Sequence, residues 1–154
     1  MNDNTILNIV IIEDVDHDVE IVRESMLQSA ANLIHFGALE PALEFLNDKG
    51  ADVVLLDLNL PDSKYLDTMK RFRGSNPEIP CVVITSMEDP ALFAQANSLG
   101  IDEFLLKTEI SGQTLARQIR KAAVNRFAGQ MEVYKDKFER IESGINEILE
   151  TIKR

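Results

Sequence analysis

The feature that most constrains this chain is a repeated alternation between short apolar segments and segments with helical spacing. Five segments rich in Val, Ile and Leu have the length and composition of strands, at residues 6–12, 33–37, 51–58, 79–84 and 101–106. Helical patterns lie between and after them, at 16–31, 41–47, 65–73, 90–99 and from about 111 onward. Such alternation with short connections predicts a parallel sheet with helices on both faces. We therefore expect an α/β fold with five parallel strands.

Polar side chains follow four of these five predicted strands. Glu13 and Asp14 follow the first strand, Asp57 the third, Thr85 the fourth and Lys107 the fifth. The carboxyl ends of parallel strands meet at one edge of the sheet, where ligands bind in open α/β folds. We therefore expect these five side chains to converge at that edge.

The chemistry of such a cluster is specific. Carboxylates brought close together repel and raise one another's pKa, and a divalent cation such as Mg²⁺ relieves that repulsion through oxygen ligands. Lys107 can pair with Asp57 or with a phosphate, and Thr85 can donate its hydroxyl to a phosphoryl oxygen. These are the parts needed to form an aspartyl phosphate. We assign Asp57 as phosphoacceptor, Glu13 and Asp14 as metal ligands, and Thr85 and Lys107 as phosphoryl-binding residues.

Together, the pair Glu13-Asp14, the run DLNLP at 57–61, the pair Thr85-Ser86 and Lys107 resemble the receiver domain of two-component response regulators, over roughly residues 5–125. The resemblance implies a flavodoxin-like, doubly wound sheet with strand order 2-1-3-4-5. It implies Mg²⁺-dependent phosphorylation of Asp57 and no organic cofactor. It also implies that the backbone carbonyl of Asn59 is a metal ligand. Thr85 and Phe104 would be the switch pair that reports phosphorylation to the face formed by the fourth helix, fifth strand and fifth helix.

Three positions depart from the family pattern or bear on its chemistry. Thr108 follows Lys107 where many relatives have proline, which leaves the conformation of that loop open. Phe104 lacks the hydroxyl of the tyrosine found in other relatives, so burial alone has to distinguish its two states. Met87, two residues past Thr85, has no group that could orient an attacking water. We therefore expect a long-lived phosphorylated form.

The C-terminal segment has a different pattern. Nine apolar residues recur there at alternating spacings of three and four: Val124, Phe127, Met131, Tyr134, Phe138, Ile141, Ile145, Ile148 and Ile152. This heptad pattern predicts one helix over 124–154, continuous with the fifth helix and forming a coiled coil with a second copy of the chain. Residues 1–123 would then be the receiver domain. The alternative is a helix folded back on its own domain, with a break at Gly129 or Gly144, because glycine destabilises a helix interior.

Composition excludes several classes of function. Of the formal charge of −10, residues 1–125 carry the whole excess, with 20 acidic and 10 basic side chains, while 126–154 carry six of each. Such acidity argues against binding to nucleic acid or to anionic membranes. There is no apolar run near 18 residues, and Cys81 has no partner for an internal disulfide. We therefore expect a cytoplasmic protein. His17 and His35 have no partners at zinc-site spacing.

The sequence thus favours a response regulator phosphorylated by a histidine kinase or phosphotransfer protein, which signals by protein interaction or homodimerisation through 124–152. It would be no enzyme beyond its own phosphorylation and slow dephosphorylation. One alternative is the receiver and linker of a longer regulator. A phosphohydrolase working through an aspartyl phosphate is disfavoured, because Asn59 is a poor proton donor or acceptor where such enzymes need an acid or base. A scaffold that accepts no phosphate is disfavoured by the intact set of Asp57, Thr85 and Lys107.

Overall fold

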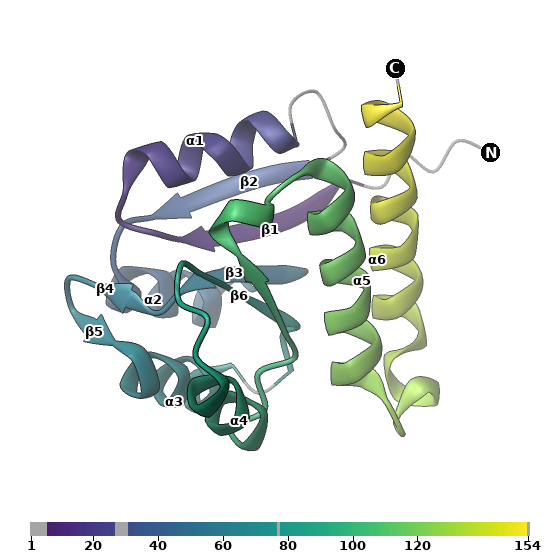
Figure 1. Cartoon of the computed structure of the whole chain (residues 1–154). Coiled ribbons are helices and arrows are strands. Elements are labelled where there is room, and N and C mark those ends of the chain that lie inside the picture. Colours follow the sequence, from purple (N-terminus) through teal and green to yellow (C-terminus); the bar gives the residue numbers. More distant parts are fainter. Residues whose placement is uncertain (1–5, 27–30, 77, 154) are drawn as a thin grey trace.

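Five parallel strands form the central sheet of the computed structural model, which describes residues 6–26, 31–76 and 78–153 (Figure 1). The strands are β1 (Leu7–Ile12), β2 (Ala31–Phe36), β3 (Val53–Asp57), β6 (Cys81–Thr85) and β7 (Glu103–Leu106). Their order across the sheet is β2-β1-β3-β6-β7, and each neighbouring pair is parallel. The predicted α/β fold and the strand order 2-1-3-4-5 are confirmed.

Helices cover both faces of the sheet. They are α1 (Asp16–Ser25), α2 (Leu39–Lys49), α3 (Tyr65–Ser75), α4 (Pro90–Ser98), α5 (Gly112–Phe127) and α6 (Met131–Ile152). Helices α1, α5 and α6 share one apolar core with the sheet, and α2, α3 and α4 share another on the opposite face. The first helix is shorter than the predicted 16–31. It ends at Ser25, residues 27–30 lie outside the described residues, and Ala31 already belongs to β2.

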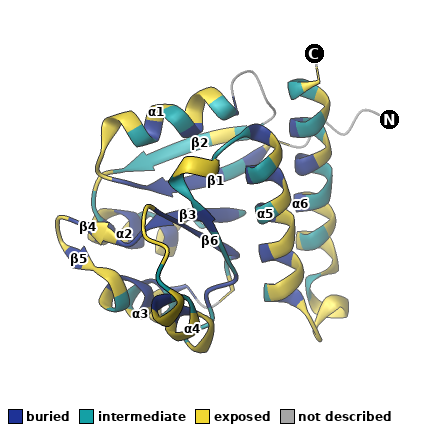
Figure 2. Ribbon diagram, in the orientation of Figure 1, coloured by how far each residue is buried: buried dark blue, intermediate teal, exposed yellow. Residues whose placement is uncertain are grey.

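The two cores follow from the period of two along a strand. In β1, Leu7, Ile9 and Ile11 point into the core under α1, α5 and α6, whereas Val10 and Ile12 point into the core under α2, α3 and α4. A strand that buries both faces has to be apolar throughout, which explains the continuous apolar runs in the sequence. Figure 2 shows the central strands fully buried and the helices buried mainly on the sides that face the sheet.

A small hairpin occupies the segment that the sequence predicted as a loop at 59–63. Strands β4 (Asn59–Leu60) and β5 (Ser63–Lys64) pair antiparallel around a two-residue turn that contains Pro61. Tyr65 follows directly, with a positive φ of 45°. After β7, a single 3-10 turn, η1 (Lys107–Glu109), leads to α5, and the predicted N-cap Ser111 forms a reciprocal capping box with Thr114.

The C-terminal prediction of one continuous helix is wrong. Helix α5 ends at Phe127, and α6 begins at Met131 and runs back beside α5 (Figure 1). The break falls at Gly129, whose φ of 79° is the left-handed conformation that glycine adopts without steric cost. The heptad stripe finds its partner within the chain, because Ile141, Ile145 and Ile148 are at most 3% exposed in the core shared with α5 and β1.

Two contacts fix α6 against the start of the sheet. Gly144 lies so close to Leu7 that a Cβ atom at this position would come within 2.7 Å of both Leu7 methyl carbons. Arg140 donates to both carboxylate oxygens of Asp52, at 2.8 and 3.0 Å, and to the carbonyl of Ile6 at 2.7 Å. Helix α6 is therefore part of the domain.

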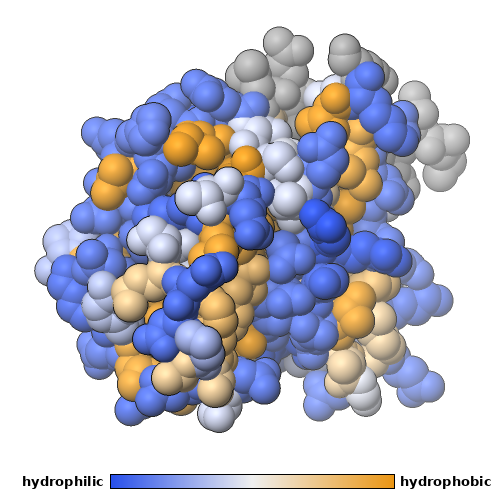
Figure 3. Space-filling model, in the orientation of Figure 1, coloured by the Kyte–Doolittle hydropathy of each residue, from blue (hydrophilic) through white to orange (hydrophobic). Residues whose placement is uncertain are grey.

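The molecular surface in the view of Figure 3 is mostly hydrophilic, with apolar side chains gathered over α4. This fits the sequence of α4, PALFAQANS, which carries no charged residue. None of the described helices is both long enough and apolar enough to span a membrane.

Candidate functional site

The predicted site residues meet at the carboxyl edge of the sheet. Asp14, Asp57, Asn59, Thr85 and Lys107 all line one pocket of about 390 Å³. Glu13 lies beside this pocket, only 2% exposed, and contacts Lys107. Each side chain is placed by the end of a strand: Glu13 directly follows β1, Asp57 ends β3, Thr85 ends β6 and Lys107 directly follows β7.

Three of the carboxylates are close enough to share one cation. Glu13, Asp14 and Asp57 each offer an oxygen, and these atoms lie within 4.8 Å of one another. Glu13 and Asp57 are buried, whereas Asp14 is exposed, so the group combines an inner and a solvent-facing side. Mg²⁺ commonly binds one or two carboxylates, keeps several waters and shares phosphate oxygens. The donor set fits that ion. The peptide N–H of Asn59 donates to Asp57 Oδ1 at 3.3 Å, which brings the Asn59 backbone to the same place.

Lys107 is the cation at the centre of the site. Its Nζ lies 2.8 Å from Glu13 Oε2, 2.8 Å from Asp18 Oδ2 and 3.4 Å from Asp57 Oδ2. The sequence did not predict a role for Asp18. The rule that found the other residues searches strand ends, and Asp18 instead lies in the first turn of α1. The available signal was its short separation in sequence from the end of β1. A helix that starts at Asp16 places its first turn close to the carboxyl ends of the strands.

The protonation of the site reflects burial and neighbouring charge. Burial raises the pKa of Glu13 to about 7, and the charge of Asp57 acts in the same direction, whereas the hydrogen bond from Lys107 opposes both. Burial would by itself lower the pKa of Lys107, but its bonds to Asp18 and Glu13 outweigh that effect and raise it. Lys107 is therefore charged at all physiological pH values.

Backbone contacts hold Glu13 in place. Its Oε1 accepts from the peptide N–H of Val15 at 3.1 Å, and its own N–H donates to the carbonyl of Phe36 at 3.0 Å. Its carbonyl lies 2.7 Å from His35 Nε2. His35 thus has a structural role behind the site.

The two predicted switch residues lie on neighbouring strands, Thr85 at the end of β6 and Phe104 in β7. Thr85 is 4% exposed, and its hydroxyl accepts from the peptide N–H of Met87 at 3.1 Å. Phe104 is half-buried, with its ring centroid 4.6 Å from that of Phe93 in α4 and the planes tilted by 47°. Gln118 of α5 donates to the Phe104 carbonyl at 2.7 Å. Phe104 therefore contacts both α4 and α5.

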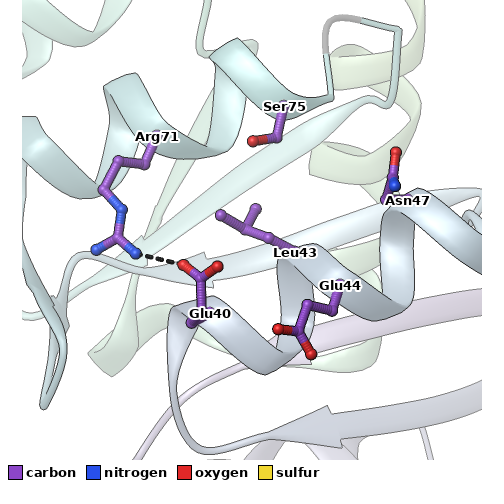
Figure 4. Close-up of a pocket in the computed structure, with 6 residues that line it drawn as sticks. All are labelled: Glu40, Leu43, Glu44, Asn47, Arg71 and Ser75. Atoms are coloured by element: carbon purple, nitrogen blue, oxygen red, sulfur yellow. Dashed lines mark hydrogen bonds and ion pairs between the residues drawn. The ribbon is translucent and has the colours of Figure 1, made fainter.

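A second and larger pocket lies elsewhere. It measures about 480 Å³ and lies between α2 and α3, lined by residues that include Leu43, Glu44 and Ser75 (Figure 4). Glu40 and Arg71 form an ion pair across it at 2.7 Å, so these two opposite charges already satisfy each other. It contains none of the clustered carboxylates or the lysine described above, and we do not take it as the functional site.

Comparison with known proteins identifies the class to which this fold and site belong. Residues 9–120 match the family described as response regulator receiver domain. This match covers more than half of the chain, and the chain belongs to that family.

Individual relatives agree with this. The chain is 29% identical over 111 residues to the transcriptional regulatory protein LnrK of Bacillus subtilis, which covers 68% of this chain and 50% of LnrK. It is 27% identical over 96 residues to the luminescence regulatory protein LuxO of Vibrio campbellii, which covers 62% of this chain and 21% of LuxO. The chain thus spans half or less of the length of these two curated relatives.

Solved structures show the same fold. The signal receiver domain of an HD domain-containing protein from Pseudomonas fluorescens superposes with a TM-score of 0.69 at 19% identity, over 80% of this chain and 91% of that one. The bacteriophytochrome response regulator AtBRR superposes with a TM-score of 0.65 at 26% identity, over 77% of this chain and 94% of that one.

Proposed function

We propose that this chain is a phosphorylation-switched response regulator that accepts a phosphoryl group on Asp57 in the presence of Mg²⁺. The observation that carries the proposal is the setting of Asp57. Its side chain is 9% exposed and opens onto the pocket, with Lys107 Nζ 3.4 Å away and the Glu13 and Asp14 carboxylates within 4.8 Å.

The chemistry follows from the positions of these groups. A carboxylate oxygen of Asp57 forms a bond to phosphorus while the bond from phosphorus to a donor's histidine nitrogen breaks, and the imidazole keeps the electron pair. Glu13, Asp14, Asp57 and the carbonyl of Asn59 would hold Mg²⁺, which when bound offsets negative charge on the phosphoryl oxygens. Lys107 pairs with one of those oxygens, and Thr85 donates its hydroxyl to another.

The phosphodonor in this proposal is a histidine kinase or phosphotransfer protein, and the output is a protein interaction. Support for the output surface comes from Phe104, which contacts Phe93 of α4 and is linked to α5 through Gln118. Because Thr85 pairs with Leu106 on the same strand as Phe104, a rearrangement at Thr85 would reach both helices through β7. The chain would have no catalytic activity beyond its own phosphorylation and slow dephosphorylation, and it would act in the cytoplasm, as its one free thiol, Cys81, suggests.

Two finer points remain predictions. A homodimer through 124–152 would require α6 to leave the core that now holds its isoleucines, and sedimentation velocity of the full chain would detect it. A receiver that belongs to a longer regulator is the main alternative, because the chain spans only 50% of LnrK and 21% of LuxO.

The proposal is tested by incubating the protein with acetyl phosphate and Mg²⁺ and measuring its intact mass. We expect a gain of one phosphoryl group that is absent without the metal and absent in Asp57→Asn. Asp48→Asn is the matched control, because the Asp48 side chain is 76% exposed at the end of α2, and it should be modified like the unsubstituted chain. An unmodified wild-type chain would instead favour a scaffold.

A further inference from the structure

Tyr65 has an unusual backbone conformation next to the phosphoacceptor. Among the described residues it is the one residue other than glycine with a positive φ, 45°. L-amino acids avoid this region because the Cβ atom crowds the backbone carbonyl, and strain of this kind gathers at functional sites. A bulky aromatic residue at such a position calls for an explanation.

Hydrogen bonds hold Tyr65 in this conformation. Its peptide N–H donates to the Leu58 carbonyl at 2.7 Å, and the buried Thr68 hydroxyl donates to the same carbonyl at 3.0 Å. Across the β4–β5 pair, Lys64 Nζ donates to the side-chain oxygen of Asn59 at 2.8 Å. Because the loop is fixed on both sides, the direction in which the Tyr65 side chain leaves the backbone is fixed as well.

The Tyr65 side chain lines the pocket of Asp57, and two further exposed apolar side chains do the same. Val15, Tyr65 and Met87 are 45%, 38% and 40% exposed, and they come from three separate segments that follow β1, β5 and β6. Large apolar side chains are rarely left exposed together without a reason. We define these three residues as the apolar collar of the pocket.

We propose that Tyr65 shields the phosphorylated Asp57 from water and is the main element of the apolar collar. This inference rests on the proposed function. In hydrolysis, a water oxygen bonds to phosphorus as the bond from phosphorus to the Asp57 oxygen breaks. The carboxylate keeps the electron pair, and the protons of the water go to the released phosphate and to solvent. The pocket of about 390 Å³ has room for several waters beside a phosphoryl group. An aromatic ring at its rim displaces some of them, and neither Val15 nor Met87 can orient the rest.

The experiment compares three substitutions at this one position. Tyr65→Phe keeps the ring, Tyr65→Ala removes the ring but keeps the backbone strain, and Tyr65→Gly removes both. Each full-length protein is loaded with acetyl phosphate and Mg²⁺ and desalted, and the loss of its phosphoryl group is followed by intact mass. We expect Tyr65→Ala and Tyr65→Gly to lose the group roughly three- to tenfold faster than wild type, and Tyr65→Phe to match wild type.

Thermal melting separates shielding from a structural role. Tyr65→Gly should melt at a higher temperature than Tyr65→Ala, because only alanine keeps the strain, while both lose the phosphoryl group equally fast. Val133→Ala, at a 77% exposed position on α6, should leave the lifetime unchanged.

Two results would overturn the proposal that Tyr65 shields the phosphorylated Asp57. One is wild-type lifetimes in both Tyr65→Ala and Tyr65→Gly, and the other is a Tyr65→Phe lifetime as short as that of Tyr65→Ala, which would assign the effect to the hydroxyl. If wild type takes up no phosphoryl group at all, the proposed function fails first and the shield fails with it, which is a different observation from equal lifetimes.

Discussion

At the scale of single residues, the position of Lys107 fits the proposed role of Asp57 as phosphoacceptor. Glu13 and Asp18 each hold the Lys107 ammonium at 2.8 Å, whereas Asp57 lies at 3.4 Å. The closer pairs occupy more of the lysine's hydrogen-bonding capacity, which leaves the Asp57 oxygens less tightly bound. A carboxylate near a positive charge but not locked to it suits a nucleophile, because its oxygens keep a free lone pair.

Asp62 is a second residue whose charge has a defined structural role. It lies in the turn between β4 and β5, and its two carboxylate oxygens accept from the peptide N–H groups of Leu39 and Glu40, each at 2.8 Å. The N-cap residue of α2, Ala38, has no side chain that could do this. Asp62 therefore caps α2 from a distant part of the chain and places a negative charge at its positive end.

This cap predicts a pH-dependent loss of stability in Asp62→Ala. Slight burial alone would raise the pKa of Asp62, but the hydrogen bonds from Glu40 and Leu39 outweigh it and lower the pKa below 3.8. A lowered folded-state pKa contributes stability above the unfolded value, and this is lost as the pH falls through the folded value. We expect a deficit of about 0.5–2 kcal/mol near neutral pH, which shrinks below pH 3.8, in urea unfolding curves.

Asp48→Ala is the control for this measurement, because its exposed carboxylate accepts no hydrogen bond from a helix N-terminus in the described residues. Its difference from wild type should stay near zero at every pH. A deficit in Asp62→Ala that did not change with pH would mean that packing, rather than the charged cap, carries the effect.

Some of the site residues can be predicted from a short sequence pattern, and others cannot. Asp57, Thr85 and Lys107 were predictable because each directly ends or follows an apolar strand, and parallel strands bring their carboxyl ends together. Asp18 and Tyr65 were not, because their importance depends on the three-dimensional path of α1 and of the β4–β5 hairpin. No rule of composition or period predicts that a tyrosine will adopt a positive φ.

At the scale of elements, the edge of the sheet at β7 shows how helix and strand are matched. Strand β7 pairs with β6 on one side. Near its outer side, Gln118 of α5 donates to the Phe104 carbonyl at 2.7 Å and Asn125 donates to the Asp102 carbonyl at 2.9 Å. Backbone groups of an edge strand are otherwise open to pairing with another chain. Helix α5 therefore both covers the core and satisfies part of this edge.

The docking of α6 on β1 predicts an inverted effect of a common stabilising substitution. Glycine to alanine inside a helix usually stabilises by up to about 1 kcal/mol. At Gly144 the added carbon would collide with Leu7, so α6 would have to move away from β1. We expect Gly144→Ala to lower the free energy of unfolding by roughly 1–3 kcal/mol. Gly74→Ala, where the added carbon has open space in α3, should raise it slightly.

The double substitution Gly144→Ala with Leu7→Ala tests whether this collision causes the loss. Removing the Leu7 side chain clears the space that the new carbon needs, so the two effects should be strongly non-additive in a double-mutant cycle. Equal, positive effects of Gly144→Ala and Gly74→Ala in thermal unfolding would show that α6 does not rest on β1 in solution.

Helices and strands were predictable where their buried apolar residues recur at a regular spacing in the sequence. The five strands and the first turns of α4 and α5 followed from apolar runs, Pro90 and the N-cap Ser111. The orientation of α6 was not determined in this way. The same stripe of isoleucines suits a coiled coil with a second chain and a helix folded back on its own α5. The contacts of α6 with the start of the sheet, through Gly144 at Leu7 and Arg140 at Asp52, and the left-handed Gly129 distinguish the two.

At the scale of the whole molecule, the division at residues 123 and 124 does not separate a core from an appendage. The electrically neutral C-terminal segment contributes Ile141, Ile145 and Ile148 to the same core as Leu7 and Phe127. It also contributes Arg140, which pairs with Asp52 of the acidic part. Packing α6 on the core buries no charge, because the stripe is apolar and the charged residues of α6 stay near the surface.

Removal of α6 is therefore expected to destabilise the receiver fold. A chain that ends at Ala128 loses three isoleucines that are at most 3% exposed, each contributing about 1.5–3 kcal/mol. Part of this is offset, because the helix no longer has to be ordered. We expect a net loss of roughly 2–4 kcal/mol in urea unfolding, together with binding of a dye that reports exposed apolar surface. Val133→Ala in the full chain, at a 77% exposed position, controls for changes in α6 that leave the core intact. Equal stability of the shortened and full chains would show that α6 is an independent appendage.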